Sequence, residues 1–123
     1  MKRIILLLII GRKKLVMENV SVKNVTAQEA NKLIIENKEV FILDVRTQGE
    51  YAGGHIPGAK LIPSSELSSR VNELENYASK PILVYCASGG RSPGAVQTLL
   101  KNNFTDIYHL NRGIMSWTYG VKR

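Results

Sequence analysis

The stretch ILVYCASGGRSPGAVQTLL, Ile82 to Leu100, contains three patterns in succession. Its first four residues, Ile82 to Tyr85, are all apolar and predict a buried strand. A glycine-rich loop follows. Ser92 and Pro93 then predict a helix start, in which Ser92 caps the helix and the proline takes the first helical position. A buried strand, a tight loop and a helix in this order are the repeating unit of a parallel α/β sheet.

The remainder of the chain repeats this alternation of strands and helices. Strands are predicted at four more short apolar runs, which are Val20–Val25, Val40–Val45, Lys60–Ile62 and Ile107–Leu110. Helices are predicted after capping-box signals at Thr26 and Thr47, and over Ser65–Leu74 and Ile114–Tyr119. Continuous apolar strands separated by helices indicate a single α/β domain with a mostly parallel sheet flanked by helices on both faces.

The charge of the chain is concentrated at its start. The 123 residues carry a net charge of +7, and five of the positive charges lie in the first sixteen residues, which contain no acid. The rest holds twelve basic and ten acidic residues, a charge of +2. Without a basic face or aromatic platforms, the composition argues against a nucleic-acid partner. A single cysteine cannot form an internal disulfide, which favours a reducing cytoplasm.

The first residues, MKRIILLLIIGRKK, join a basic start to an apolar run from Ile4 to Ile10. As a helix, this run would cover only about 10 Å of the roughly 30 Å hydrocarbon core of a membrane. We therefore expect residues 1–16 to be an N-terminal extension outside a domain of residues 17–123. Membrane association or export through this apolar segment is the alternative.

The only cysteine, Cys86, stands where the strand Ile82–Tyr85 ends. In parallel α/β sheets, ligands bind at this end of the strands. Small residues allow the loop to curl and to aim several N–H groups at one point, and a helix start with a nearby arginine lowers the pKa of a thiol. The sequence thus predicts a catalytic thiolate at Cys86 in an anion-binding loop. The loop residues expected to bind the substrate are Ala87, Ser88, Gly89, Gly90 and Arg91.

Three segments in order resemble the single-domain rhodanese-like proteins of the thiosulfate sulfurtransferase type. They are FILDVRTQGEYAGGHIPGAKLIP at 41–63, ILVYCASGGRS at 82–92 and HLNRGIMSW at 109–117. The resemblance covers Val22 to Trp117 and implies a five-stranded parallel sheet flanked by helices. It also implies that Cys86 takes a sulfur from thiosulfate or a persulfide and passes it to a thiol, cyanide or a thioredoxin-like acceptor, with no cofactor.

Two other classes of function stay open. Related phosphatases and arsenate reductases place five residues between cysteine and arginine, whereas Cys86 and Arg91 enclose four, the spacing of the sulfurtransferases. The shorter ring suits one sulfur atom better than a phosphoryl group. A noncatalytic rhodanese-like module, which binds a partner or carries sulfur in a relay, is the second alternative.

Four further residues are candidates for supporting roles. Asp44 and Arg46 are interpreted mainly as a structural pair, with substrate contact as the alternative. Ser92 is expected to cap its helix, and Arg91 to stabilise anions or tie the loop to the fold. Arg112 stands where the family commonly has the first glycine of a pair, which places a cation near the mouth of the site. His55 and His109 are interpreted as structural, and no cluster predicts a metal.

Overall fold

The computed structural model of the chain describes the backbone of residues 2–10 and 14–123 and the side chains of residues 20–123. Six strands form one sheet in the order β1-β2-β6-β5-β3-β4. Their bounds are β1 Lys2–Ile10, β2 Lys14–Val25, β3 Phe41–Asp44, β4 Lys60–Leu61, β5 Ile82–Tyr85 and β6 Asp106–Leu110. From β2 to β4 every neighbouring pair is parallel, which confirms the predicted five-stranded parallel sheet.

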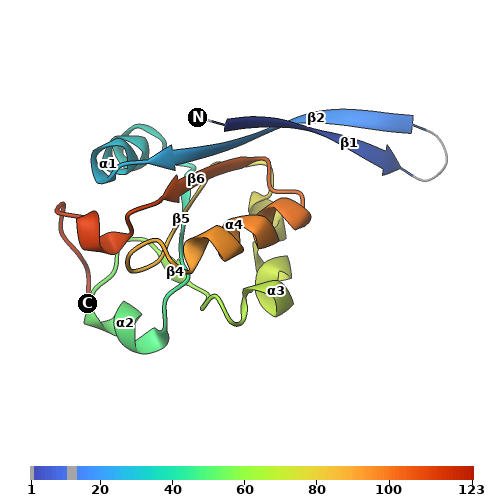
Figure 1. Cartoon of the computed structure of the whole chain (residues 1–123). Helices are drawn as coiled ribbons and strands as arrows, with labels where there is room; N and C mark the ends of the chain where they lie inside the picture. The colour runs from blue at the N-terminus through green and yellow to red at the C-terminus, as the bar shows by residue number, and fades with distance from the viewer. Residues whose placement is uncertain (1, 11–13) are drawn as a thin grey trace.

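The sixth strand, β1, was not expected from the sequence. It pairs antiparallel with β2 along its whole length, from Lys2 opposite Val22 to Ile10 opposite Lys14. Since β2 pairs with β6 only over residues 21–25, the end of the β1–β2 hairpin nearest its turn, formed by residues 4–10 and 14–20, projects beyond the remaining strands (Figure 1). The expected boundary between residues 16 and 17 falls inside β2 and stays a prediction. Two basic residues of the expected extension, Arg12 and Lys13, lie outside the described residues.

Two of the helices, α1 Ala27–Glu36 and α2 Gln48–Gly53, begin at their predicted capping boxes. The others are α3 Leu67–Arg70 and α4 Ser92–Lys101, with 3-10 helices η1 Val71–Tyr77 and η2 Ile114–Ser116. Both capping boxes are confirmed: Thr26 and Thr47 each accept a backbone N–H three residues on, and the glutamate there accepts the N–H of the threonine. The predicted helix over residues 65–74 is instead the short α3 continued by η1, and the last helix is a single 3-10 turn.

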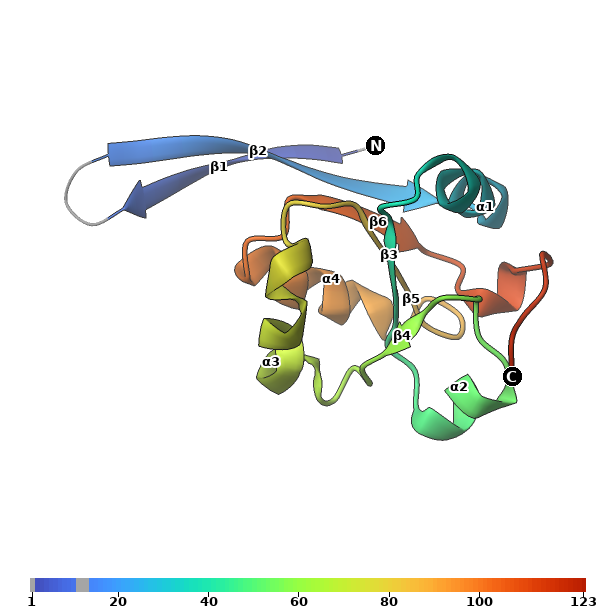
Figure 2. The ribbon, with the colours of Figure 1, turned by 180° about the vertical axis from the view of Figure 1, so that it is seen from behind.

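Strand β5 divides the core into two layers. Ile82, Val84 and Cys86 point to one face, where they pack with residues of α3, η1 and α4. Leu83 and Tyr85 point to the other face, which α1 covers. Figures 1 and 2 show α1 on one side of the sheet and α3 and α4 on the other, as predicted. None of the helices in the described part of the chain has the length and apolar character needed to cross a bilayer.

Candidate active site

The thiol of Cys86 lies in a ring of backbone amides just past the end of β5. Its side chain is completely buried, and the N–H of Gly89 donates a hydrogen bond to Sγ at 3.1 Å. The N–H groups of Arg91 and Ser92, at the start of α4, also face the sulfur. Glycine is needed at position 89 because its φ is +100°. The loop therefore has the anion-binding geometry that its glycines predicted.

Ser92 does not cap α4, contrary to the sequence prediction. Arg91 occupies the N-cap position without a side-chain hydrogen bond, and Ser92 is the first helical residue. The hydroxyl of Ser92 is instead drawn into a tertiary contact: it lies 3.3 Å from Sγ of Cys86 and 2.6 Å from Nε2 of His109. The hydroxyl is hydrogen-bonded to these two partners and therefore does not bond to the backbone N–H groups at the start of the helix.

The surroundings of Cys86 act on its pKa in opposite directions. Burial raises the pKa of the thiol, because a thiolate is poorly solvated away from water. Hydrogen bonds from the Ser92 hydroxyl and from the backbone amides of Arg91, Ser92 and Gly89 favour the thiolate. They outweigh burial, so the pKa of Cys86 lies below its ordinary value.

A second loop, Asn111 to Gly113, packs directly against the cysteine loop. A Cβ on Gly113 would overlap the carbonyl oxygen of Ala87, and a Cβ on Gly89 would overlap that of Asn111. The carbonyl groups of Cys86 and Ala87 accept the N–H groups of Ile114 and Met115, at 2.9 and 3.0 Å. The two loops thus form one interlocked unit, which holds the amides of the cysteine loop in place.

Arg91 is tied to helix α2. Its guanidinium forms two hydrogen bonds with the carboxylate of Glu50, at 2.7 and 2.9 Å. The hydrogen bond from Arg91, with a second from the backbone of Thr47, lowers the pKa of Glu50 from 4.5 to about 2. Of the two roles considered for Arg91, this contact supports the one in which it ties the loop to the fold. The sequence predicts Glu50 only as part of a capping box. Its pairing with Arg91 is not predictable, because the two residues are 41 positions apart and leave no local pattern.

Replacing Glu50 with glutamine tests this tie. Glutamine preserves the capping box, so the variant loses mainly the charge opposite Arg91. A folded-state pKa below the unfolded one stabilises the fold above pH 4.5, and that contribution disappears as the pH falls toward about 2. We expect Glu50→Gln to be less stable than the wild type at neutral pH, by at most about 1 kcal/mol for a partly exposed pair. Urea denaturation should show this difference closing between pH 4.5 and 2.

Glu29→Gln is the matched control for this experiment. Glu29 occupies the same capping-box position in α1 as Glu50 does in α2. No ion pair of Glu29 is found among the described residues. A stability difference for Glu50→Gln that did not vary with pH, or that Glu29→Gln reproduced, would contradict the assignment.

Asp44 and Arg46 lie on the other face of the sheet from Cys86. Their side chains form a buried ion pair at 2.7 Å, and Arg46 also donates to the carbonyl oxygen of Gly54 at 2.7 Å. The hydroxyl of Tyr85 donates to Asp44 at 2.6 Å and accepts the N–H of Ile56 at 3.1 Å. These contacts join the ends of β3 and β5 to the loop after α2, which is the structural role that the sequence favoured.

The other predicted residues differ in their exposure and in their distance from the cysteine loop. Ala87 and Gly89 are half-buried, whereas Ser88 and Gly90 are exposed. Arg112 is exposed in the second loop, beside Gly113, and a role toward substrate stays a prediction. His55 stacks on Tyr51 at 3.7 Å between ring centroids, away from Cys86. Within residues 2–10 and 14–123, no group of three or more His, Cys, Asp or Glu side chains could hold a metal.

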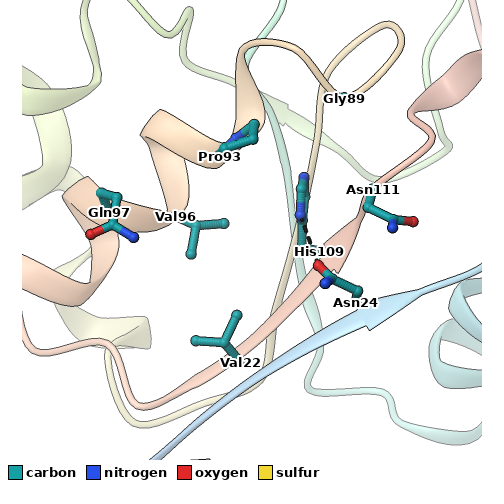
Figure 3. A pocket seen from close by; sticks show the side chains of 8 residues that line it. All are labelled: Val22, Asn24, Gly89, Pro93, Val96, Gln97, His109 and Asn111. Atoms are coloured by element: carbon teal, nitrogen blue, oxygen red, sulfur yellow. Dashed lines mark hydrogen bonds between the residues drawn. The ribbon is translucent and has the colours of Figure 1, made fainter. Parts of the chain in front are cut away.

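A pocket of about 480 Å³ reaches the cysteine loop at Gly89 (Figure 3). It lies between β2, β6 and α4 and is lined by Val22, Asn24, Gly89, Pro93, Val96, Gln97, His109 and Asn111. The ring of His109 stands in this lining, and its Nδ1 lies 3.1 Å from Oδ1 of Asn24. His109 lies in the predicted strand, and its contact with Ser92, seventeen positions earlier, leaves no local pattern in the sequence.

The chain is similar in sequence and in fold to several known proteins. The uncharacterized protein YqhL of Bacillus subtilis is 44% identical over 85 residues, covering 69% of this chain and 66% of YqhL. The thiosulfate sulfurtransferase GlpE of Pseudoalteromonas translucida is 30% identical over 84 residues, covering 68% of this chain and 78% of GlpE. A crystal structure of a rhodanese-like domain protein from Staphylococcus aureus aligns with a TM-score of 0.71 at 34% identity, covering 81% and 96% of the two chains. Since the rhodanese-like domain pattern also matches residues 26–119, the chain belongs to the rhodanese-like domain family.

Proposed function

We propose that this protein transfers a sulfane sulfur from a donor such as thiosulfate to a thiol or another nucleophilic acceptor, through a persulfide on Cys86. The observation that supports this most directly is the ring of amides from Gly89, Arg91 and Ser92 around Sγ, together with the lowered pKa of the thiol. Both features favour a sulfur anion. The thiosulfate sulfurtransferase among the relatives points to the same chemistry.

The proposed reaction has two displacement steps. The thiolate of Cys86 attacks the outer sulfur of thiosulfate, so that a new S–S bond forms while the old one breaks and its electron pair leaves with sulfite. The terminal sulfur of the persulfide is then held by the same amides that held the thiolate. An acceptor thiolate attacks that sulfur, and the Cys86 thiolate is released. We propose a thioredoxin-like protein, a small thiol or cyanide as acceptor, and a reducing cytoplasm as the compartment.

Intact mass spectrometry tests the proposal. The reduced wild-type protein, incubated with thiosulfate, should gain the mass of one sulfur atom, and cyanide or dithiothreitol should remove it. Cys86→Ser should gain none. Absence of sulfur on the wild-type protein with both thiosulfate and a small persulfide donor would contradict the proposal.

Two companion assays separate the alternatives. Sulfur loading without turnover to cyanide or thiols would favour a relay carrier over an enzyme. Hydrolysis of an aryl phosphate by the wild type, but not by Cys86→Ser, would favour a phosphatase.

A further inference from the structure

A chain of hydrogen bonds connects the buried thiol to the pocket of Figure 3. It runs from Sγ of Cys86 to the Ser92 hydroxyl at 3.3 Å, on to Nε2 of His109 at 2.6 Å, and from Nδ1 of His109 to Oδ1 of Asn24 at 3.1 Å. Its members come from the cysteine loop, α4, β6 and β2. Cys86 and Ser92 have no solvent-exposed surface, while Asn24 is exposed.

The count of hydrogens along this chain restricts what happens when Cys86 ionises. The Ser92 hydroxyl has one hydrogen, and the thiolate and a bare Nε2 are both acceptors. If the hydroxyl donated to the thiolate while Nε2 also lacked a hydrogen, two lone pairs would face each other at 2.6 Å. A thiolate that is hydrogen-bonded by Ser92 therefore requires a hydrogen on Nε2 of His109.

The position of Asn24 indicates where that hydrogen comes from. With an amide oxygen beside Nδ1, the neutral imidazole keeps its hydrogen on Nδ1, so that Nε2 is bare and accepts from Ser92. In the same state the thiol donates to Ser92. Each side chain of the chain then donates to the next one, in the direction from Cys86 to Asn24. If each of the first two protons moves to its acceptor, the Cys86–Ser92 and Ser92–His109 hydrogen bonds reverse their direction.

We propose that His109 receives the Cys86 thiol proton through the hydroxyl of Ser92, a role that rests on the proposed use of Cys86 as a nucleophile. The S–H bond breaks as its proton passes to Oγ, and the original hydroxyl proton of Ser92 passes to Nε2. The product is a thiolate that accepts from Ser92, and an imidazolium whose Nδ1–H still donates to Oδ1 of Asn24. His109 does not touch the sulfur and is thus a positioning residue for this step.

Two carboxylates on neighbouring elements are already engaged. Asp44 is bound by Arg46 and Tyr85 on the opposite face of the sheet, and Glu50 is bound by Arg91. The positive charge of Arg91 favours the thiolate but offers no place for a proton. On β2 and β6, next to Asn24 and His109, the ammonium group of Lys23 lies over the ring of Tyr108. Among the described residues, α4 contributes no ionisable side chain next to His109, because its one charged residue is Lys101 at the far end.

The burial of His109 suits a proton acceptor. Its side chain is 7% exposed, and this desolvation lowers the pKa of the imidazole below its ordinary value. His109 is then unprotonated at neutral pH, as an acceptor must be. With the thiol protonated and the imidazole neutral, the chain of hydrogen bonds contains no ion pair, so no buried charges have to be stabilised until Cys86 ionises.

The ultraviolet absorbance of the thiolate provides a direct test, because Cys86 is the only cysteine and Cys86→Ala gives the blank. In His109→Gln, an amide can still bond to Ser92 but cannot take up a proton. We expect the titration midpoint of Cys86 to rise by about one pKa unit, roughly a tenfold lower thiolate-to-thiol ratio below the midpoint. His55→Gln is the matched control, since it makes the same change at a buried histidine that contacts Tyr51.

A second variant gives a shift of opposite sign and leaves the core intact. In Asn24→Asp, at an exposed position, the carboxylate would stabilise the protonated imidazole, and we expect the Cys86 midpoint to fall. The coupling also acts in the other direction: the imidazole titration of His109, followed by NMR, should shift in Cys86→Ala.

The outcomes distinguish this inference from the proposed function. If the titration midpoint of Cys86 moved no more in His109→Gln than in His55→Gln, or moved downward, the proposed proton transfer to His109 would be overturned. A His109 titration that did not respond to Cys86→Ala would overturn it as well. If the wild-type protein failed to load sulfur while the titrations of Cys86 and His109 shifted as expected, the proton transfer to His109 would stand and the proposed sulfur transfer would be contradicted.

Discussion

Gly89→Ala is expected to abolish sulfur loading on Cys86 and to destabilise the fold. The added Cβ would overlap the carbonyl oxygen of Asn111, and the backbone at position 89 has a φ of +100°. The obstructing carbonyl of Asn111 belongs to the backbone and cannot rotate away as a side chain could, so the two loops must separate. Backbone strain and overpacking together should cost about 3 kcal/mol. The N–H that donates to Sγ would move with the loop.

The neighbouring glycine provides the control. Gly90→Ala makes the same substitution one residue later, where a Cβ meets no atom within 4 Å. Urea denaturation should place Gly90→Ala close to the wild type and Gly89→Ala far below it, and intact mass spectrometry should find no added sulfur on Gly89→Ala. Equal stability of the two variants would contradict the interlocked arrangement of the loops.

Asp44→Ala is expected to destabilise the protein by about 3–5 kcal/mol, because it leaves a buried charge without its partner. Arg46 is 6% exposed and would keep its positive charge, because a guanidinium is not deprotonated in proteins. Its remaining hydrogen bond is to the neutral carbonyl of Gly54, which does not balance that charge. The hydroxyl of Tyr85 would also lose its acceptor. Denaturant unfolding at neutral pH measures the loss directly.

An exposed ion pair serves as the comparison for Asp44→Ala. Glu66 and Arg70 form a salt bridge at 2.9 Å on the surface, where solvent and salt screen the attraction. Glu66→Ala should therefore change the stability by less than about 1 kcal/mol. If Asp44→Ala cost no more than Glu66→Ala, burial of the pair would not be what makes Asp44 important.

Features with local causes were predictable from the sequence. The capping boxes at Thr26 and Thr47 depend on residues three positions apart, and both occur as predicted. The alternating directions of β5 side chains follow from strand geometry, which places Tyr85 and Cys86 on opposite faces. The same alternation explains why Asp44, paired with Tyr85, lies away from the thiol.

Features caused by contacts between distant segments were not predictable. The capping role of Ser92 was wrong because His109, seventeen positions later in the chain, competes for its hydroxyl. Arg91 was recognised as important, but Glu50 as its partner was not. The helix expected over residues 65–74 is α-helical only over Leu67–Arg70 and continues as a 3-10 helix, and its apolar periodicity alone does not distinguish the two forms.

The strand order has a consequence for biosynthesis. β6 is the last strand to be made, yet it lies between β2 and β5 near the middle of the sheet. A nascent chain that has emerged only as far as α4 already contains its sulfhydryl, but lacks both His109 and the loop that locks Gly89. Because β6 pairs with strands made earlier, Cys86 should become chemically competent only after β6 and the loop Asn111 to Gly113 have left the ribosome.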